Sequence, residues 1–423
     1  VHRVEATFTR GYQMHASIGP SAALAQWEEG ALTVWTHSQG VRVLRVSLAE
    51  ALGVDPAIVR LVHVPGPGCY GHNGADDAAL DAALLAREAG GRPVLLKWMR
   101  DDEHRWEPYG PATVVKTSAG VDENGRIVDW NHEAWSQTHL ARPFPAGERS
   151  GLLAAWHREQ PMQAPDVEPI LLYHTGIHRN ADPLYAVGRR RIVKHLVTAP
   201  SVRTSSTRAL GAYANVFAIE STMDELAEAA GVDPVEFRLR HLEDERARAV
   251  IQAAAERADW GGRPAHEGWG RGLGFAQYKN VAAYAAVIAD VIVDDETAVI
   301  RVERAVIAAD AGEVVDPSGL ANQLEGGVVQ STSWTLKEQV SFDRTRVTSI
   351  DWETYPILTF AEAPDVETVL LDQPGEPFLG AGEAAQGPTA AAIANAVYDA
   401  VGIRLRDIPF TPERLRNTAL DAA

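Results

Sequence analysis

Alternating or continuous apolar runs along the chain predict short strands, and apolar residues at helical spacing predict helices between them. In the first 65 residues this pattern predicts a hairpin with strands at 23–26 and 32–36, joined by the turn Glu28-Glu29-Gly30. A helix over 46–52 follows, and then a strand over 58–64. The chain therefore opens with mixed strands and helices.

The rest of the chain continues this mixture. Two more hairpins are predicted, around the Asn-Gly turn at 122–125 and around 294–296. The predicted strands are 93–99, 112–118, 127–135, 287–293 and 298–308, and the predicted helices are 76–89, 216–230, 235–242, 246–258, 388–401 and one after Thr411-Pro412. Between 140 and 190 six prolines interrupt any periodicity. We expect an irregular excursion there, a surface lid or partner contact rather than a domain linker.

These elements predict an α+β fold in which antiparallel hairpins lie beside helices. Gly and Pro concentrate at 259–270, which is the best linker candidate. We therefore expect one domain over 1–258 and a second over 271–423.

Composition and charge exclude several classes of function. With 39 Lys and Arg against 57 Asp and Glu among 423 residues, 39 − 57 gives a net charge of −18, which disfavours binding to nucleic acid. Cys69 is the single cysteine, so disulfides, a four-cysteine zinc site and a cysteine-bound iron–sulfur cluster are excluded within this chain. Gly-x-Ser-x-Gly does not occur, which disfavours a serine hydrolase, and we expect no zinc site of side-chain ligands.

The chain has no run of 18 apolar residues, and it begins at Val1 without a signal peptide. Either a segment was removed upstream or the sequence starts inside a larger gene product. We expect a cytoplasmic location, with a periplasmic one left open.

A glycine-rich run at 66–74 (GPGCYGHNG) precedes the helix predicted at 76–89. Such a loop lets main-chain N–H groups approach an anion or a cofactor, although it matches neither a P-loop nor a dinucleotide fingerprint. The alternative is an ordinary strand–helix turn. Cys69 within it is either a nucleophile or, more commonly, a small buried thiol.

A second small-residue run, 380–388 (GAGEAAQGP), surrounds Glu383 just before a predicted helix. A carboxylate between glycines fits a general base whose protonation is tuned by its surroundings, and a helix-capping acid is the alternative.

Two further motifs carry polar side chains in small-residue contexts. Gln323 and Gln330 are seven residues apart and so share a helix face, which suits the edge of a polar heterocycle or, alternatively, solvent. Arg208, in the run 208–215 (RALGAYAN), is placed to hold an anion or polarise a carbonyl, with a surface salt bridge as the alternative.

In their order along the chain, these four motifs resemble the molybdopterin-binding large subunit of the xanthine oxidase family, in its isoquinoline 1-oxidoreductase or nicotinate dehydrogenase branch. The resemblance runs from about Tyr12 to the C-terminus and is most specific over 380–396, 403–416 and 322–330. It implies that both expected domains bind molybdopterin.

The resemblance implies a role for each matching residue. Glu383 matches the catalytic glutamate beside the molybdenum, Arg208 an arginine near substrate and metal, and Gln13 a glutamine near an oxo ligand of the metal. The implied cofactor-binding residues are Tyr70, Gly71, Gly211, Ala212, Gln323 and Gly382. No side chain is expected to ligate the metal. The glycine loop departs from the family pattern by one extra residue.

The implied reaction oxidises an N-heteroaromatic compound or an aldehyde. Glu383 removes a proton from a water-derived oxygen, and the electrons leave through a partner [2Fe-2S] subunit, with a FAD subunit or a cytochrome as further candidate partners. The cofactor is molybdopterin with molybdenum, its cytosine dinucleotide form is left open, and no iron–sulfur cluster or flavin is expected in this chain.

The Met-Gly-Gln-Gly segment of the family does not occur, so another chain or an upstream segment should complete the cofactor site. A non-catalytic assembly subunit and an aldehyde- or carbon monoxide-oxidising relative are the alternatives. Substrate choice should depend on the 140–190 excursion and on residues around 275–284.

Overall fold

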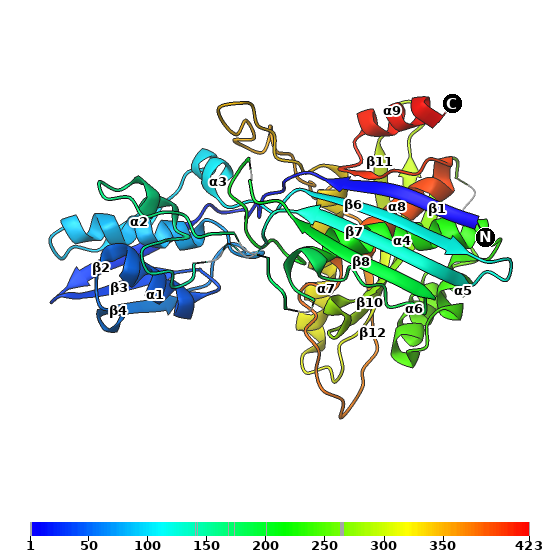
Figure 1. Cartoon of the computed structure of the whole chain (residues 1–423), viewed down its shortest axis with the longest axis horizontal. Coiled ribbons are helices and arrows are strands. Elements are labelled where there is room, and N and C mark those ends of the chain that lie inside the picture. The colour runs from blue at the N-terminus through cyan, green and yellow to red at the C-terminus, as the bar shows by residue number, and fades with distance from the viewer. Residues whose placement is uncertain are drawn as a thin grey trace.

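The computed structural model describes residues 2–422 except 140, 142, 168, 173, 200 and 263–265. A small lobe lies at one end of the long axis and a larger body at the other (Figure 1). In the lobe, a four-stranded sheet in the order β4-β3-β2-β5 packs its apolar side chains against helices α1 and α2. The lobe elements are β2 (Ala22–Glu28), β3 (Ala31–Thr36), α1 (Val41–Leu52), η1 (Pro56–Ile58), β4 (Val59–His63), α2 (Ala75–Glu88) and β5 (Val94–Lys97).

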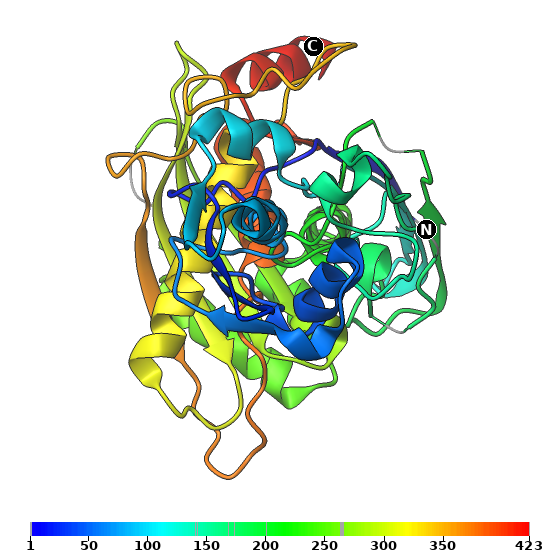
Figure 2. The same ribbon diagram turned by 90° about the vertical axis from the view of Figure 1, so that its left-hand side faces the viewer.

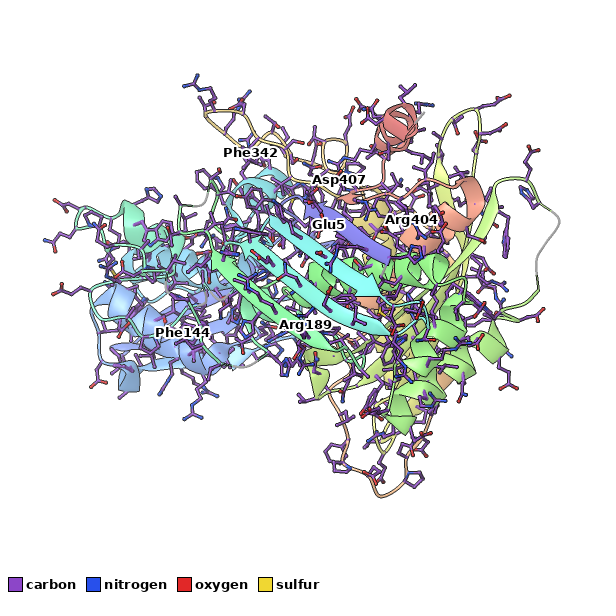
Figure 3. All side chains as sticks on the ribbon, turned by 45° about the vertical axis from the view of Figure 1, so that its right-hand side comes forward. Glu5, Phe144, Arg189, Phe342, Arg404 and Asp407 are labelled. Carbon is purple, nitrogen blue, oxygen red and sulfur yellow. The ribbon has the colours of Figure 1, made fainter. Side chains whose placement is uncertain are left out.

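The larger body has a five-stranded sheet in the order β13-β1-β6-β7-β8. Buried and exposed residues alternate along β6, as expected for a sheet covered on one face. Helix α4 packs against the covered face through Phe217, which contacts Phe8 edge-on. The opposite face is turned outward, where Glu5 and Arg189 are seen in Figure 3. The strands are β1 (His2–Arg10), β6 (Thr113–Val121), β7 (Ile127–Ser136), β8 (Arg189–Leu196) and β13 (Asp407–Ile408).

A second sheet of the body, in the order β12-β11-β10-β9, is covered on both faces. Alternate residues of β10 belong to different cores: Val287 packs with α8 residues, whereas Ile288 packs with α6 residues. The continuous apolar run of β10 follows from burial of both faces of the sheet. These elements are α4 (Ala212–Ala229), α5 (Pro234–Arg240), α6 (Glu245–Arg257), β9 (Trp269–Gln277), β10 (Tyr284–Val293), β11 (Ile300–Asp310), β12 (Asp365–Leu370) and α8 (Gln386–Val401).

Close contact between β9 and α8 depends on glycines at alternate positions of the strand. A Cβ at Gly270, Gly272 or Gly274 would lie 2.2 Å from a main-chain oxygen of α8. Since every second residue of a strand faces the same side, these glycines let the Ala-rich helix lie directly on the strand. The packing brings the end of β9 beside the start of α8, where the site described below lies.

The remaining elements connect or flank these layers. Figure 2, which faces the small lobe, shows α7 (yellow) running along one side of the molecule. These elements are α3 (Arg100–Trp106), η2 (Leu153–His157), η3 (Gly176–His178), η4 (Tyr278–Asn280), α7 (Pro317–Leu336) and α9 (Pro412–Ala422). In the part of the chain that the structure describes, no helix combines the length and the apolar character needed to cross a membrane.

The predicted α+β class and the three hairpins are confirmed. The helix predicted over 46–52 begins five residues earlier, at Val41, and β8, β9, β12 and α3 were not predicted. Part of the predicted linker, 263–265, lies outside the described residues. The hydrophobic cores contain residues from both sides of it, and the division into 1–258 and 271–423 stays a prediction.

Candidate functional site

Arg208 lies on a tight turn that leads into α4. Ala209 and Leu210, the next two residues, have positive φ angles of 72° and 53°. Residues with a Cβ rarely adopt this left-handed conformation, and it persists only where the surroundings impose it. The turn therefore holds the Arg208 side chain in a defined direction at the start of a buried helix.

The Arg208 guanidinium joins motifs that lie far apart in the sequence. Its Nε donates to the main-chain oxygen of Gly382 at 2.6 Å. Its Nη2 donates to the main-chain and side-chain oxygens of Gln323 at 2.9 and 3.3 Å, and Nη1 donates to Gln330 Oε1 at 3.3 Å. Burial lowers the pKa of Arg208, and the nearby Glu383 opposes this effect. The Arg208 turn, the α7 face and the loop before α8 thus form one cluster.

Glu383 lies in the same cluster, surrounded by hydrogen-bond donors. Its Oε1 accepts from the main-chain N–H of Ala209 at 3.1 Å, and its Oε2 accepts from the hydroxyl of Tyr278. Arg179 Nη1 lies 3.8 Å from Oε2. The Glu383 side chain is 32% exposed, so a ligand can reach it. A fixed, accessible carboxylate is suited to accept a proton.

The turn at Tyr70 and Gly71 packs against the Arg208 turn. Gly71 has a φ of 128°, and a Cβ there would lie 1.9 Å from the main-chain oxygen of Ser206. A β-bridge pairs Gly71 with Thr207, the residue before Arg208. Only glycine fits this approach, and the Tyr70 side chain remains partly exposed beside it.

A cavity of about 500 Å³ lies between these segments. One wall is a stripe along α7 at steps of three or four residues, which is one face of a helix. This stripe consists of Asn322, Gln323, Gly326, Val329, Gln330, Ser333 and Trp334, and the other lining residues are His15, Ala16, Tyr70, Arg208, Glu338, Ile357 and Leu358. The predicted shared face of Gln323 and Gln330 is therefore confirmed, and it faces this cavity.

The cavity fits the pterin that the sequence resemblance implies. Side-chain amides of the α7 stripe supply donors and acceptors in a row, as the polar edge of a fused heterocycle needs. A Cβ at Gly326 would meet no atom within 4 Å, so the wall there is open to a ligand. In the described part of the chain, no group of three or more His, Cys, Asp or Glu is placed to hold a metal ion.

Three predicted site residues are not brought to the Glu383 carboxylate. Gln13 is buried and is not among the lining residues, and its Nε2 donates to two main-chain carbonyls at the end of α7 at 3.3 and 3.4 Å. A Cβ at Gly211 would lie 2.4 Å from main-chain oxygens of η3, so this glycine serves close packing. Ala212 is 2% exposed at the first position of α4. Their roles at a cofactor stay predictions.

Sequence reasoning missed Tyr278 and Arg179 as individual residues. It pointed only to the segments that carry them, 140–190 and 275–284. Both side chains are buried, at 5% and 8% exposure, and they come from η4 and from the residue after η3. No local signal marks either residue, because their contacts with Glu383 span 105 and 204 positions.

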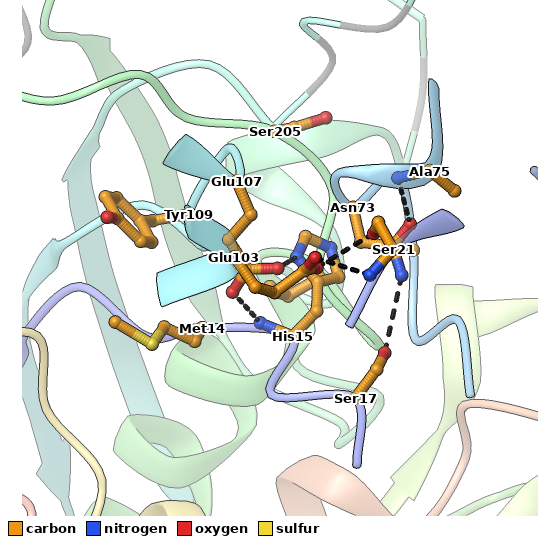
Figure 4. Close-up of polar contacts among 12 residues, drawn as sticks. Met14, His15, Ser17, Ser21, Asn73, Ala75, Glu103, Glu107, Tyr109 and Ser205 are labelled. Atoms are coloured by element: carbon orange, nitrogen blue, oxygen red, sulfur yellow. Dashed lines mark hydrogen bonds and ion pairs between the residues drawn. The ribbon is translucent and has the colours of Figure 1, made fainter. Parts of the chain in front are cut away.

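A second polar cluster includes His15, Glu103 and Glu107 (Figure 4), and its His15 ring lies next to Gly71. His15 Nε2 lies 2.6 Å from the main-chain oxygen of Ser206, and His15 Nδ1 lies 3.2 Å from Glu107 Oε2. Since both neighbours are acceptors, both ring nitrogens carry protons. Burial alone would lower the pKa of His15, but Glu107 raises it overall. Burial also raises the pKa of Glu103, which accepts from Ser21, to about 7. Sequence reasoning did not identify this cluster.

Known proteins match this chain over most of its length. Family models described as the molybdopterin cofactor-binding domain match residues 1–146 and 197–364. The chain is 42% identical to a nicotinate dehydrogenase subunit of Pseudomonas putida, over 98% of this chain and 35% of that protein. It is 28% identical to the beta subunit of isoquinoline 1-oxidoreductase of Brevundimonas diminuta, over 93% of this chain and 48% of that protein. The chain thus spans between a third and a half of these relatives.

Solved structures share the fold at low sequence identity. Quinoline 2-oxidoreductase from Pseudomonas putida 86 superposes with a TM-score of 0.82 at 15% identity, covering 100% of this chain and 76% of that one. Aldehyde oxidoreductase from Desulfovibrio gigas gives a TM-score of 0.78 at 17% identity, covering 99% of this chain and 61% of that one.

Proposed function

Because this chain belongs to the molybdopterin-binding subunits of the xanthine oxidase family, we propose that it forms part of an enzyme that oxidises an N-heteroaromatic compound or an aldehyde with oxygen derived from water. One observation carries the proposal: Arg208 and Gln323 line the cavity together with the rest of the α7 stripe. Hydrogen bonds from Arg208 and from the Ala209 N–H hold Gly382 and Glu383 next to this wall. When bound there, molybdopterin with molybdenum supplies the two-electron redox chemistry.

The residues at and beside the cavity have distinct roles in this reaction. The amides of Gln323 and Gln330 hold the polar edge of the pterin, and the Tyr70–Gly71 main chain approaches the other side of the site. Glu383 accepts a proton from the water-derived oxygen that enters the product. Arg208, positively charged and fixed by three acceptor groups, stabilises negative charge that develops on the substrate.

The electrons have to leave this chain. A single cysteine cannot ligate an iron–sulfur cluster, so we propose that a partner [2Fe-2S] subunit receives them, directly or ahead of a FAD subunit or a cytochrome. A segment outside this chain completes the pterin site. We further propose the cytosine dinucleotide form of the cofactor, which acid hydrolysis would identify by releasing cytidine monophosphate. The cytoplasmic location stays a prediction, which cell fractionation tests.

The test uses the complex purified from cells that co-express this protein with its neighbouring genes. Molybdenum is measured per chain, and turnover is measured with nicotinate, quinoline, isoquinoline and benzaldehyde. We expect near-stoichiometric molybdenum and turnover of at least one N-heteroaromatic compound or of benzaldehyde. Glu383→Gln should keep the molybdenum and lower kcat by roughly 100-fold or more, since general base catalysis contributes about that much.

Glu353→Gln is the matched control, because Glu353 is exposed in a loop away from the cavity. It should retain wild-type turnover and molybdenum. A complex without molybdenum would identify a non-catalytic assembly subunit and overturn the proposal. Unchanged turnover in Glu383→Gln would overturn the role of this carboxylate.

A further inference from the structure

The hydrogen bonds between Arg179, Tyr278 and Glu383 run in one direction. Arg179 Nη1 donates to the Tyr278 hydroxyl oxygen at 2.6 Å. A guanidinium has only donors, so the Tyr278 oxygen must accept from it. The Tyr278 proton is then directed to its other neighbour, Glu383 Oε2. The hydroxyl is therefore a fixed donor to the carboxylate.

Both side chains are anchored by groups outside the cavity. Arg179 Nε donates to the main-chain oxygen of His174 at 3.2 Å, and the Asn215 amide donates to the main-chain oxygen of Arg179 at 2.9 Å. Asn180 donates to the oxygen of Gln277 at 2.8 Å and accepts from the N–H of Lys279 at 2.8 Å. Segment 179–180 and η4 are thus joined on both sides of the Arg179–Tyr278 contact.

The main-chain conformation of these segments indicates that the surrounding structure holds Arg179 and Tyr278 in place. Asn180, Lys279 and Asn280 have φ angles of 58°, 57° and 56°. Residues with side chains seldom adopt this conformation, Asn more readily than Lys, and such residues concentrate where a site depends on fixed geometry. Ala209, whose N–H donates to Glu383, also has a positive φ, so main chain of this kind lies beside Tyr278 and at the Glu383 contact.

We propose that Tyr278 and Arg179 are positioning residues that hold the Glu383 carboxylate in one orientation as the base of the reaction. This inference rests on the proposed function of Glu383. The groups that face the carboxylate from the packed segments are Tyr278, Arg179, the charged Arg208 and the Ala209 N–H, and all of them are hydrogen-bond donors. Burial, with Glu383 beside it, raises the pKa of Tyr278 well above its usual value, so this hydroxyl stays protonated as a donor.

The test compares Tyr278→Phe with Glu383→Gln in the purified complex. A hydrogen bond to a charged group contributes enough that its loss should lower kcat by roughly 10-fold or more, with KM changed less than about threefold and molybdenum unchanged. The carboxylate then loses a fixed donor, so the effect should appear in kcat and not in substrate binding. Tyr398→Phe is the matched control, since this tyrosine also donates to a glutamate, Glu228, but from the C-terminal end of α8, whereas Glu383 lies just before the first turn of that helix.

Two variants of Arg179 test the same inference independently, in case Tyr278→Phe does not fold. Arg179→Met should show the same fall in kcat with KM little changed, and Arg179→Lys, which retains a cationic donor, should restore most of the lost kcat. In the metal-free protein, the infrared carboxylate band that disappears in Glu383→Gln should change in frequency in Tyr278→Phe and in Arg179→Met, because the carboxylate has lost its hydrogen bond from Tyr278 or the support of that donor.

Wild-type kcat and an unchanged frequency of the infrared carboxylate band in Tyr278→Phe and Arg179→Met would overturn this inference while Glu383→Gln remains impaired. Unchanged turnover in Glu383→Gln would instead overturn the proposed function itself. The two failures are therefore distinguishable.

Discussion

Two carboxylates of this protein lie near cations, and their surroundings differ. Glu383 is partly exposed, and donors from several separate segments surround it. The Glu107 side chain is fully buried and pairs with His15, whose main-chain N–H also donates to Glu107 at 2.8 Å. The first carboxylate can exchange a proton with a ligand, whereas the second cannot be reached.

Under the proposed function, this difference separates a carboxylate that accepts a proton from one that supports the fold. His15 contacts the oxygen of Ser206, and that same oxygen accepts from the N–H of His72 in the glycine-rich loop. The buried His15–Glu107 pair therefore supports the Tyr70–Gly71 turn, whereas Glu383 is the group proposed to react. Substitutions in the two clusters should affect different measurements.

The largest expected effect is on stability, from Glu107→Ala. Removing one partner of a buried ion pair leaves His15 as an uncompensated charge, which costs about 3–5 kcal/mol. Denaturant unfolding of the purified chain measures this loss. Glu383→Gln is the comparison and should cost far less because its side chain is partly exposed. Equal costs for the two variants would remove the distinction drawn here.

Glu338 tests what burial does to a carboxyl that lines the cavity. Burial raises the pKa of Glu338 to about 7, and its hydrogen-bond donors are the neutral hydroxyls of Ser333 and Tyr355. The stability that its proton provides is full below about 4.5 and is lost as the pH rises through about 7, a loss of roughly 3 kcal/mol. Glu338→Gln should remove most of this difference between unfolding at pH 5 and at pH 8. An identical pH dependence in the variant would contradict the assignment.

Gly71→Ala should disturb the turn that the His15 cluster supports. The new Cβ would overlap the Ser206 oxygen, so the turn must shift, at a cost of order 1–3 kcal/mol, and bound molybdenum in the complex should fall. Gly90→Ala is the control, because Gly90 also has a positive φ but its Cβ would meet no atom within 4 Å. Full molybdenum content in Gly71→Ala would show that the turn tolerates displacement.

Arg208→Lys should give the smallest effect, limited to the reacting cluster. Lysine keeps the charge but cannot make the forked contacts with Gly382, Gln323 and Gln330, so we expect kcat to fall several-fold with stability nearly unchanged. Arg189→Lys, on the outer face of the sheet, should leave kcat unchanged. A fall of similar size in both variants would contradict a specific role for Arg208.

The sequence predicted the parts of the fold that depend on neighbouring residues. The hairpin between β6 and β7 follows from the Asn124-Gly125 turn, and the capped helices follow from short local signals. Helix α7 was recognised only over 322–330, because Gly326 and Gly327 disfavour a helix locally. Gly327 is explained by tertiary packing, since a Cβ there would lie 2.8 Å from the Cβ of Ala385.

The candidate site likewise contains residues that the local sequence predicts and residues that it does not. Glu383, Arg208 and Gln323 were identified in small-residue motifs, and the structure brings them together. Tyr278 and Arg179 could not be found, because each is an ordinary residue in its own segment and acquires its role only through contacts across the fold. Local pattern predicts which loops are built for close approach, but not which distant side chains meet there.

The lone thiol of the chain offers a natural reporter of occupancy at this cavity. Cys69 precedes Tyr70, its Sγ lies 2.9 Å from the main-chain oxygen of Gly71, and its side chain is partly buried. Burial raises the pKa of Cys69, so labelling with a maleimide dye requires alkaline pH. With one cysteine in the sequence, a dye attaches at a single position without engineering, and its emission would follow loading of the pterin in real time.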